Sequence, residues 1–157
     1  MKAFVSGGAG FIGSSLVDRL LDLGHEVTVY DNLSTGLLQF LEYAKDFDRF
    51  RLVEGDLLDE DTLSGAIAGH EFVFHLAAKN CISDCQKDPV ETTDINITGT
   101  INVFEASRLA NVKKIIYAES AAVYEGCTKL PSSEKESAPE SFYAISKEST
   151  ALLANAY

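Results

Sequence analysis

The chain has 157 residues, 46% of them apolar, which is enough for one globular domain with a hydrophobic core. Its net charge is −11, and no run of Lys or Arg is long enough to follow a phosphate backbone, so we expect no nucleic-acid partner. No apolar run reaches the ~18 residues of a membrane span, and the N-terminus lacks the pattern of a signal peptide. We therefore expect no membrane partner and a cytoplasmic location.

The three cysteines, Cys81, Cys85 and Cys127, are an odd number, and we expect them to be reduced thiols. The Cys81-x-x-x-Cys85 spacing suggests a metal site. A structural zinc site needs four ligands in paired clusters, however, and His70 and His75 do not form a second pair. We therefore expect no metal.

The N-terminal stretch KAFVSGGAGFIGSS predicts a buried strand at residues 3–6 and a helix at 11–23, with Gly7, Gly10 and Gly13 between them. Glycine permits a tight turn and lets backbone N–H groups approach a pyrophosphate closely. The start of the helix adds unpaired N–H groups and partial positive charge. This pattern favours a dinucleotide-binding turn, and an ordinary glycine-rich turn is the alternative.

A second predicted strand, at residues 26–30, ends in Asp31, 18 positions after Gly13. A carboxylate at this place can accept hydrogen bonds from the adenosine ribose and repels the 2′-phosphate of NADP. Asp31 therefore favours NAD as the cofactor, and an ordinary surface aspartate is the alternative.

Further elements follow in alternation along the chain. They are a polar turn at 32–36, a short helix at 37–45, strands at 50–53, 71–76 and 112–118, a loop at 119–140, and helices at 59–67, 88–109 and 141–157. Asp59, Asp88-Pro89 and Ser141 supply the helix starts. Asp56 follows the third strand, where ligands bind in open α/β sheets, although a solvent-exposed loop acid fits equally well.

This alternation predicts a doubly wound parallel α/β sheet, a Rossmann fold, of about five strands with helices on both faces. We expect residues 1–157 to form a single dinucleotide-binding domain.

Tyr143 and Lys147 are four residues apart on the last predicted helix, so both project from one face. A nearby ammonium favours the phenolate and lowers the pKa of a tyrosine, which is near 10 when unperturbed. Ser120, after the fifth strand, could donate a hydrogen bond to the same substrate oxygen. A surface aromatic beside a solvated lysine is the alternative for this pair.

The chain resembles the extended branch of the short-chain dehydrogenase/reductase superfamily, in particular the nucleotide-sugar epimerase/dehydratase family. The resembling segments are SGGAGFIGSSL, YDNLSTG, GDLLD, FHLAA, DINITGTINVFEAS, YAESAAVYEG and SFYAISK. The resemblance implies that Tyr143 is the catalytic base, that Lys147 binds the nicotinamide ribose and tunes Tyr143, and that Ser120 orients the substrate hydroxyl. The cofactor-binding residues that it implies are Gly7, Gly10, Phe11, Ile12, Gly13, Asp31, Asn32, Asp56, Leu57, Ala77, Ala78, Lys79, Asn96, Tyr143 and Lys147.

The segment after Ser120 bears on the reaction. Dehydratases of the family resemble Thr-Asp-Glu-Val-Tyr here, whereas this chain has Ala121 and Ala122, which cannot transfer protons. The Ser-Ala-Ala-Val-Tyr pattern is similar to UDP-sugar 4-epimerases. The resemblance therefore implies NAD-dependent epimerisation of a UDP-hexose at C4, with a dehydratase or reductase of the same family as the alternative.

Glu119 and Glu125 depart from the family pattern, because relatives usually have a small residue and a direct Tyr-Gly step at these places. Family members also continue into a C-terminal substrate region. We expect this chain to be a truncated form that binds NAD weakly at most. A non-catalytic NAD-binding module is a second hypothesis. A homodimer is implied by the resemblance alone.

Overall fold

The computed structural model describes all residues from 1 to 157, and the chain divides into two compact units. The first, Met1–Ala77 with Asn102–Ala118, contains every strand, and we call it the sheet unit. The second, Ala78–Ile101 with Glu119–Tyr157, contains helices and turns, and we call it the helical unit. Each is described by itself, and the expectation of a single domain stays a prediction.

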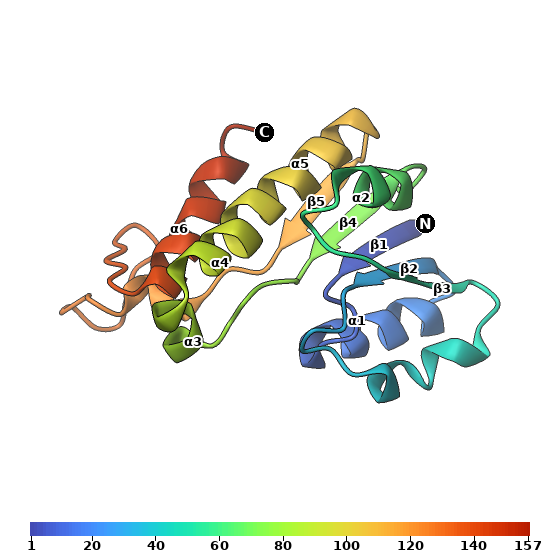
Figure 1. The fold of residues 1–157 in the computed structure, drawn as a ribbon, viewed down its shortest axis with the longest axis horizontal. Helices are drawn as coiled ribbons and strands as arrows, with labels where there is room; N and C mark the ends of the chain where they lie inside the picture. The colour runs from blue at the N-terminus through green and yellow to red at the C-terminus, as the bar shows by residue number, and fades with distance from the viewer. The chain divides into compact units, whose positions relative to one another are not determined.

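The sheet unit contains a parallel sheet of five strands in the order β3-β2-β1-β4-β5 (Figure 1). The strands are β1 (Lys2–Ser6), β2 (Glu26–Asp31), β3 (Phe50–Glu54), β4 (Phe72–His75) and β5 (Lys114–Tyr117). The strands β3 and β5 are the edges of the sheet. The predicted parallel five-stranded sheet is confirmed.

Helices cover both faces of this sheet. The helices α1 (Phe11–Asp22) and α2 (Glu60–Ile67) lie on opposite faces (Figure 1). The helix α5 (Gly99–Leu109) contributes its residues from Asn102 onward to the sheet unit, and its Phe104 ring contacts His75 at 6.4 Å and Tyr117 at 5.9 Å between ring centroids. The doubly wound, Rossmann-like architecture is confirmed.

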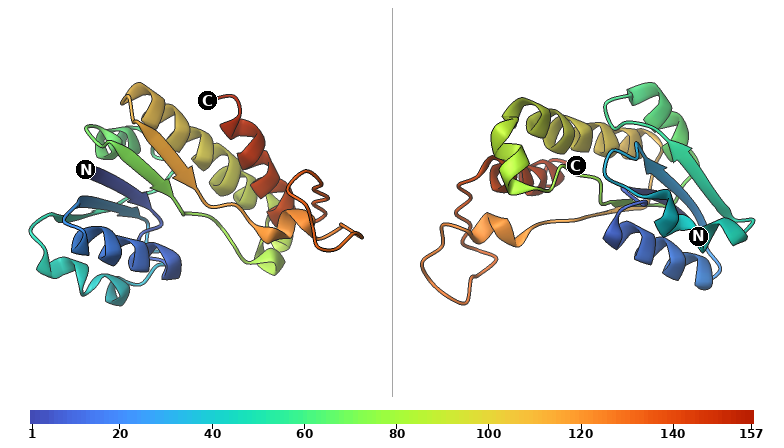
Figure 2. Two further views of the ribbon diagram at one scale, coloured as in Figure 1. Left: turned by 180° about the vertical axis from the view of Figure 1, so that it is seen from behind. Right: turned by 60° about the horizontal axis from the view of Figure 1, so that its bottom comes forward.

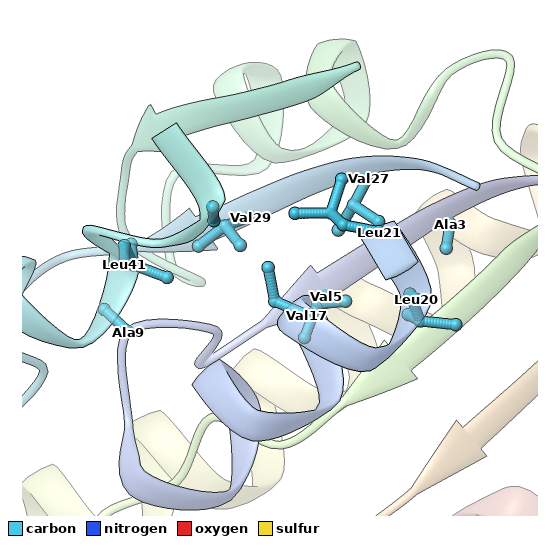
Figure 3. Packing of buried hydrophobic residues seen from close by; sticks show 10 residues of the cluster. Ala3, Val5, Ala9, Val17, Leu20, Leu21, Val27, Val29 and Leu41 are labelled. Atoms are coloured by element: carbon cyan, nitrogen blue, oxygen red, sulfur yellow. The ribbon is translucent and has the colours of Figure 1, made fainter. Parts of the chain in front are cut away.

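The core beneath α1 follows from the alternation of side chains along each strand. Val5 and Val29 pair across β1 and β2 and are fully buried. They pack with Val17 and Leu21 of α1, which lie on its inner side (Figure 3). Apolar burial of this kind supplies most of the stability of the sheet unit.

The helical unit is organised around α6 (Phe142–Ala154). This helix packs against four elements of the same unit. They are α3 (Ile82–Lys87), α4 (Pro89–Thr93), the π-helical segment η3 (Asp94–Thr98) and the 3₁₀ turn η4 (Ala121–Tyr124). Residues 125–140 make a long irregular excursion between η4 and α6, drawn in orange in Figure 2.

Two local expectations were wrong, and one short helix was missed. The segment 37–45 is not an α-helix but two 3₁₀ turns, η1 (Leu38–Leu41) and η2 (Ala44–Asp46). Its buried residues Leu41 and Ala44 are three apart, which matches the 3₁₀ repeat. The helix α3 was not predicted, since it has six residues and no capping side chain. The helix expected at 88–109 is interrupted by η3.

The helix starts at Asp59, Asp88 and Ser141 are confirmed, because each side chain accepts a hydrogen bond from a backbone N–H of its helix. No helix is both long enough and apolar enough to span a bilayer.

The core beneath α1 yields a stability prediction. Leu21 is fully buried, so Leu21→Ala should lower the free energy of unfolding by roughly 2–5 kcal/mol. Leu23 follows directly after the helix and exposes 53% of its surface, so Leu23→Ala should change it by less than about 0.5 kcal/mol. Urea unfolding followed by circular dichroism measures both. Equal losses would contradict this account of the core.

Candidate functional site

The glycine turn between β1 and α1 leaves no room for a side chain at Gly7 or Gly13. Gly7 has a φ of +74°, and a Cβ there would lie 2.6 Å from the amide nitrogen of Ala77. A Cβ on Gly13 would overlap the carbonyl oxygen of Gly7 and lie 2.8 Å from the Cα of Gly8. The start of α1 therefore lies directly against the turn, as the sequence pattern predicts.

The N-terminus of α1 is open. Gly10 is its N-cap and has no side chain to cap the helix, and the first turn carries no acidic residue. The N–H groups of Phe11, Ile12 and Gly13 have no partner within the helix, because an α-helix leaves its first N–H groups unpaired. The side chains of Phe11 and Ile12 are 81% and 67% exposed. Such a terminus can bind a phosphate or another anion.

Asp31 connects the glycine turn to the loop after β2. Its side chain is buried, and its two carboxylate oxygens accept hydrogen bonds from the N–H groups of Ala9 and Leu33, each at 2.9 Å. Each carboxylate oxygen has a further lone pair, so Asp31 can also accept hydrogen bonds from a ligand hydroxyl. Gly36 lies against it, because a Cβ at that position would be 2.9 Å from Oδ1 of Asp31.

Asp56 and Asn32 are joined beyond the ends of β3 and β2. The Asn32 side-chain amide donates to Oδ2 of Asp56 at 2.8 Å, and the backbone N–H of Leu58 donates to Oδ1 at 2.9 Å. Leu57 is buried, and its carbonyl accepts a hydrogen bond from the side chain of Asn102 at 2.9 Å. Asn32 and Asp56 therefore form a fixed polar rim at the carboxyl edge of the sheet.

The Tyr30 side chain contacts this polar rim through a hydrogen bond. Its hydroxyl donates to the backbone carbonyl of Asp56 at 2.8 Å. Burial, together with the carboxylates of Asp59 and Asp56, raises the pKa of Tyr30 to about 12, so its hydroxyl stays protonated as a donor at neutral pH. The sheet unit thus contains these predicted cofactor residues: Gly7, Gly10, Phe11, Ile12, Gly13, Asp31, Asn32, Asp56, Leu57 and Ala77.

The predicted catalytic residues all lie in the helical unit. Tyr143 and Lys147 lie one turn apart on α6, and Lys147 exposes only 6% of its surface. Ser120 is the N-cap of η4, where its Oγ accepts a hydrogen bond from the N–H of Ala122 at 3.1 Å. Because η4 packs against α6, the fold brings the segment that carries Ser120 to the helix that carries the other two.

The charge of Lys147 depends on two opposing effects. Burial lowers the pKa of its ammonium below the ordinary value, because the charged form loses hydration. The Glu119 carboxylate acts in the opposite direction and favours the charged form. Lys147 therefore combines a desolvated ammonium with a nearby negative charge.

Asn96 joins three elements of the helical unit through its buried side chain. Its Oδ1 accepts from the backbone N–H of Lys79 at 2.8 Å, and its Nδ2 donates to the Lys79 carbonyl at 3.0 Å and to Oγ of Ser146 at 2.9 Å. Ser146 in turn donates to the carbonyl of Tyr143 at 2.7 Å. The loop after β4 is thereby tied to the first turn of α6.

The side chain of Lys79 pairs with Glu91 of α4, and this hydrogen bond raises the pKa of its ammonium. The helical unit thus contains the remaining predicted residues, which are Ala78, Lys79, Asn96, Ser120, Tyr143 and Lys147. No group of three or more His, Cys, Asp or Glu side chains gathers in the geometry of a metal site, and Cys81, Cys85 and Cys127 are free thiols.

Sequence reasoning missed the local functions of Glu125 and Ser146. The Glu125 carboxylate accepts hydrogen bonds from the N–H groups of Glu140 at 2.6 Å and Ser141 at 2.5 Å, which hold its pKa below the ordinary value. The Glu125 carboxylate therefore holds the backbone at the start of α6, and its negative charge is engaged by these hydrogen bonds. The sequence identified Ser141 as a helix cap. A hydrogen bond between residues 15 positions apart, such as Glu125 and Glu140, leaves no pattern in the sequence. The function of Ser146 could have been suspected from the sequence, because a serine stands beside Lys147 on the inner side of α6.

The fold defines the class of the protein: an α/β protein with a Rossmann-like parallel sheet and a glycine turn at its first helix. The model of the NAD dependent epimerase/dehydratase family matches residues 3–157, so the chain belongs to this family.

Known proteins of similar sequence and structure carry epimerase names. A UDP-glucose 4-epimerase of Mycolicibacterium smegmatis is 40% identical over 161 residues, covering 100% of this chain and 51% of the relative. The structure of a UDP-N-acetylglucosamine 4-epimerase from Methanobrevibacter ruminantium superposes with a TM-score of 0.93 at 35% identity, covering 99% of this chain and 49% of that one. A UDP-glucose 4-epimerase of Thermus thermophilus in complex with NAD gives a TM-score of 0.90 at 31% identity, covering 100% and 50%. The chain therefore spans about half the length of these relatives.

The Asn96 network can be tested through stability. Asn96→Ala leaves the backbone groups of Lys79 without these partners, so it should lower the free energy of unfolding by roughly 1–3 kcal/mol and speed amide exchange at Lys79. The neighbouring Asp94 is exposed, and Asp94→Ala should have little effect. Hydrogen exchange followed by NMR measures the protection of the Lys79 amide in both variants. Unchanged protection of the Lys79 amide in Asn96→Ala would exclude this anchoring role.

Proposed function

We propose that this chain supplies the NAD-binding and proton-transfer residues of a nucleotide-sugar 4-epimerase that acts on a UDP-hexose. The observation that carries the proposal is the gathering of Ser120, Tyr143 and Lys147 in one compact unit, through the packing of η4 against α6. The names of the relatives, which include UDP-glucose and UDP-N-acetylglucosamine 4-epimerases, support the substrate class.

The sheet unit fits a dinucleotide. At Gly7 and Gly13 the backbone is packed so closely that no Cβ fits, which places the start of α1 against the turn. The uncapped N-terminus of α1 offers N–H groups to a pyrophosphate. Asp31 lies at the end of the second strand, where an adenosine ribose is bound in Rossmann folds. Asn32, Asp56 and Leu57 are proposed to hold the adenine end, with Ala77 beside the turn.

The proton chemistry is assigned to the helical unit. NAD, when bound, would supply a reversible hydride acceptor for C4 of the sugar. Tyr143 takes the proton of the C4 hydroxyl and later gives it back. Lys147 is proposed to bind the nicotinamide ribose, and Ser120 to donate a hydrogen bond to the same sugar oxygen as Tyr143. Ala78, Lys79 and Asn96 are proposed to flank the cofactor.

Ala121 and Ala122 favour epimerisation over water loss. Both residues belong to the η4 turn that follows Ser120, and neither can donate or accept a proton. A dehydratase requires an additional acid and base for elimination, and this turn lacks them. Epimerisation at C4 is therefore favoured over a dehydratase reaction.

A cytoplasmic location and a homodimer are further parts of the proposal. The homodimer rests on the family resemblance alone.

The proposed reaction is tested by incubating the chain with NAD and UDP-glucose and following UDP-galactose by proton NMR. Tyr143→Phe should reduce the rate by about 10²–10⁴-fold, because it removes the acid-base group, while leaving NAD affinity nearly unchanged. Phe142→Tyr is a matched control on an exposed neighbour and should keep the wild-type rate. Full activity in Tyr143→Phe, or a large loss of NAD affinity in this variant, would contradict the proposal.

The cofactor assignment predicts a change in selectivity. Asp31→Ala should weaken NAD binding and reduce the discrimination against NADP, because the carboxylate that repels the 2′-phosphate is removed. Asp31→Asn is the sharper variant, since its amide oxygen can still accept one of the hydrogen bonds from Ala9 or Leu33. Calorimetric titration with NAD and NADP measures both affinities, with Asp48→Asn as a control at an exposed acid. An unchanged ratio of affinities would remove this role from Asp31.

A further inference from the structure

The loop that follows β3 is held by two side chains from other elements of the sheet unit. The hydroxyl of Tyr30, on β2, donates to the carbonyl of Asp56 at 2.8 Å. The side-chain amide of Asn102, on α5, donates to the carbonyl of Leu57 at 2.9 Å. Two successive carbonyls of the loop therefore accept hydrogen bonds from β2 and from α5, and neither donor is among the proposed cofactor residues.

The core fixes the position of the Tyr30 hydroxyl. Tyr30 exposes 1% of its surface, and its ring packs against Phe4 of β1 with 5.7 Å between ring centroids. The ring also lies directly against Gly55, since a Cβ at that position would be 2.5 Å from Cζ and from Oη of Tyr30. The loop can approach the ring this closely because Gly55 has no side chain. The Asp56 carbonyl is thus bound to a hydroxyl that cannot shift freely.

These hydrogen bonds also orient the N–H groups of the loop. In a trans peptide the N–H points opposite to the carbonyl, so the N–H of Leu57 points away from Tyr30. The next N–H, that of Leu58, donates to Oδ1 of Asp56 at 2.9 Å. The N–H of Leu57 has no acceptor within the chain, although Leu57 is buried. A buried N–H of this kind is available to a ligand.

The loop therefore offers a donor beside an acceptor. The donor is the Leu57 N–H, and the acceptor is the carboxylate of Asp56. Its two oxygens each accept one hydrogen bond, from Leu58 and from Asn32, and each keeps a further lone pair. An adenine ring has the complementary pair, with N1 as acceptor and the N6 amino group as donor. A hypoxanthine ring, with a carbonyl at C6 and a proton on N1, has the reverse of both.

We propose that Tyr30 and Asn102 are positioning residues that give the cofactor site its selectivity for adenine. They hold the carbonyls of Asp56 and Leu57, so that the donor and the acceptor of the loop face the base together. This inference rests on the proposed function and deepens it, because it names residues that act on the cofactor only through the loop. Loss of either side chain changes the choice of base, whereas general destabilisation weakens the binding of every dinucleotide alike.

The selectivity is tested by calorimetric titration with NAD and with nicotinamide hypoxanthine dinucleotide. The wild-type chain should prefer NAD. Tyr30→Phe keeps the ring and removes the hydroxyl, and Asn102→Leu keeps the size of the side chain and removes the donor. Each should reduce the preference by about 3–10-fold, which is the effect of one hydrogen bond. Tyr43→Phe is the matched control and should keep the wild-type preference, because it removes a hydroxyl that donates to Asp22 at 2.7 Å on the exposed surface of the same unit.

The ratio of the two affinities distinguishes positioning from stability. A variant that binds both dinucleotides more weakly by the same factor would overturn the proposal. An unchanged preference in the variants, or a wild-type chain without preference, would also overturn it. Because Tyr30 and Asn102 act from different elements, either variant decides the question if the other does not fold.

A measurement without ligand separates this inference from the proposed function. The Leu58 amide is bonded to the Asp56 carboxylate, so its hydrogen exchange, followed by NMR, reports how firmly the loop is held. Exchange should be about 3–10-fold faster in Tyr30→Phe and in Asn102→Leu, and unchanged in Tyr43→Phe. If the wild-type chain binds neither dinucleotide, the proposed cofactor site fails, and this exchange rate still decides whether the two side chains hold the loop. Unchanged exchange in Tyr30→Phe and Asn102→Leu would overturn the proposal.

Discussion

The contact between the start of α1 and the turn before it is the constraint on which the sheet unit depends. A methyl group on Gly13 would overlap the carbonyl of Gly7, and one on Gly7 would meet the backbone at Ala77. Because these backbones touch, the apolar side of α1 lies close enough to β1 and β2 for Val17 and Leu21 to fill the core. The open end of the helix is therefore a result of the same packing that stabilises the fold.

The helical unit is held together differently, by buried polar groups that satisfy one another. Asn96 lies in a π-helical segment, and its side chain contacts the backbone of Lys79 and the hydroxyl of Ser146. An isolated buried amide would be costly, but one with three hydrogen bonds is stable and specifies a single arrangement. The wider π turn and these three bonds occur at the same residue. The π-helical conformation at Asn96 therefore places its side chain where it can form the hydrogen bonds that hold α6 in position.

The order and type of the main elements could be predicted from the sequence, because they depend on local signals. Alternating apolar runs marked the strands, and Asp59, Asp88 and Ser141 marked helix starts through caps that act within one turn. The π segment, the helix α3 and the anchoring by Glu125 could not be predicted, since each depends on contacts made across space. Glu125 illustrates this point: the sequence showed it only as a departure from the family pattern, but its carboxylate accepts hydrogen bonds from backbone N–H groups 15 and 16 residues further on.

The candidate site was predictable to the extent that its residues follow strands or share a helix face. The spacing of Tyr143 and Lys147 predicted only that they share a helix face, whereas the burial of Lys147 required the packing of α6. These contacts also bear on how an acidic chain with a net charge of −11 can bind an anionic ligand. The ammonium of Lys79 is already paired with Glu91, and that of Lys147 is buried, which lowers its pKa. The backbone N–H groups at the start of α1 carry partial positive charge that no acidic side chain in the first turn offsets, so this helix end can attract an anion.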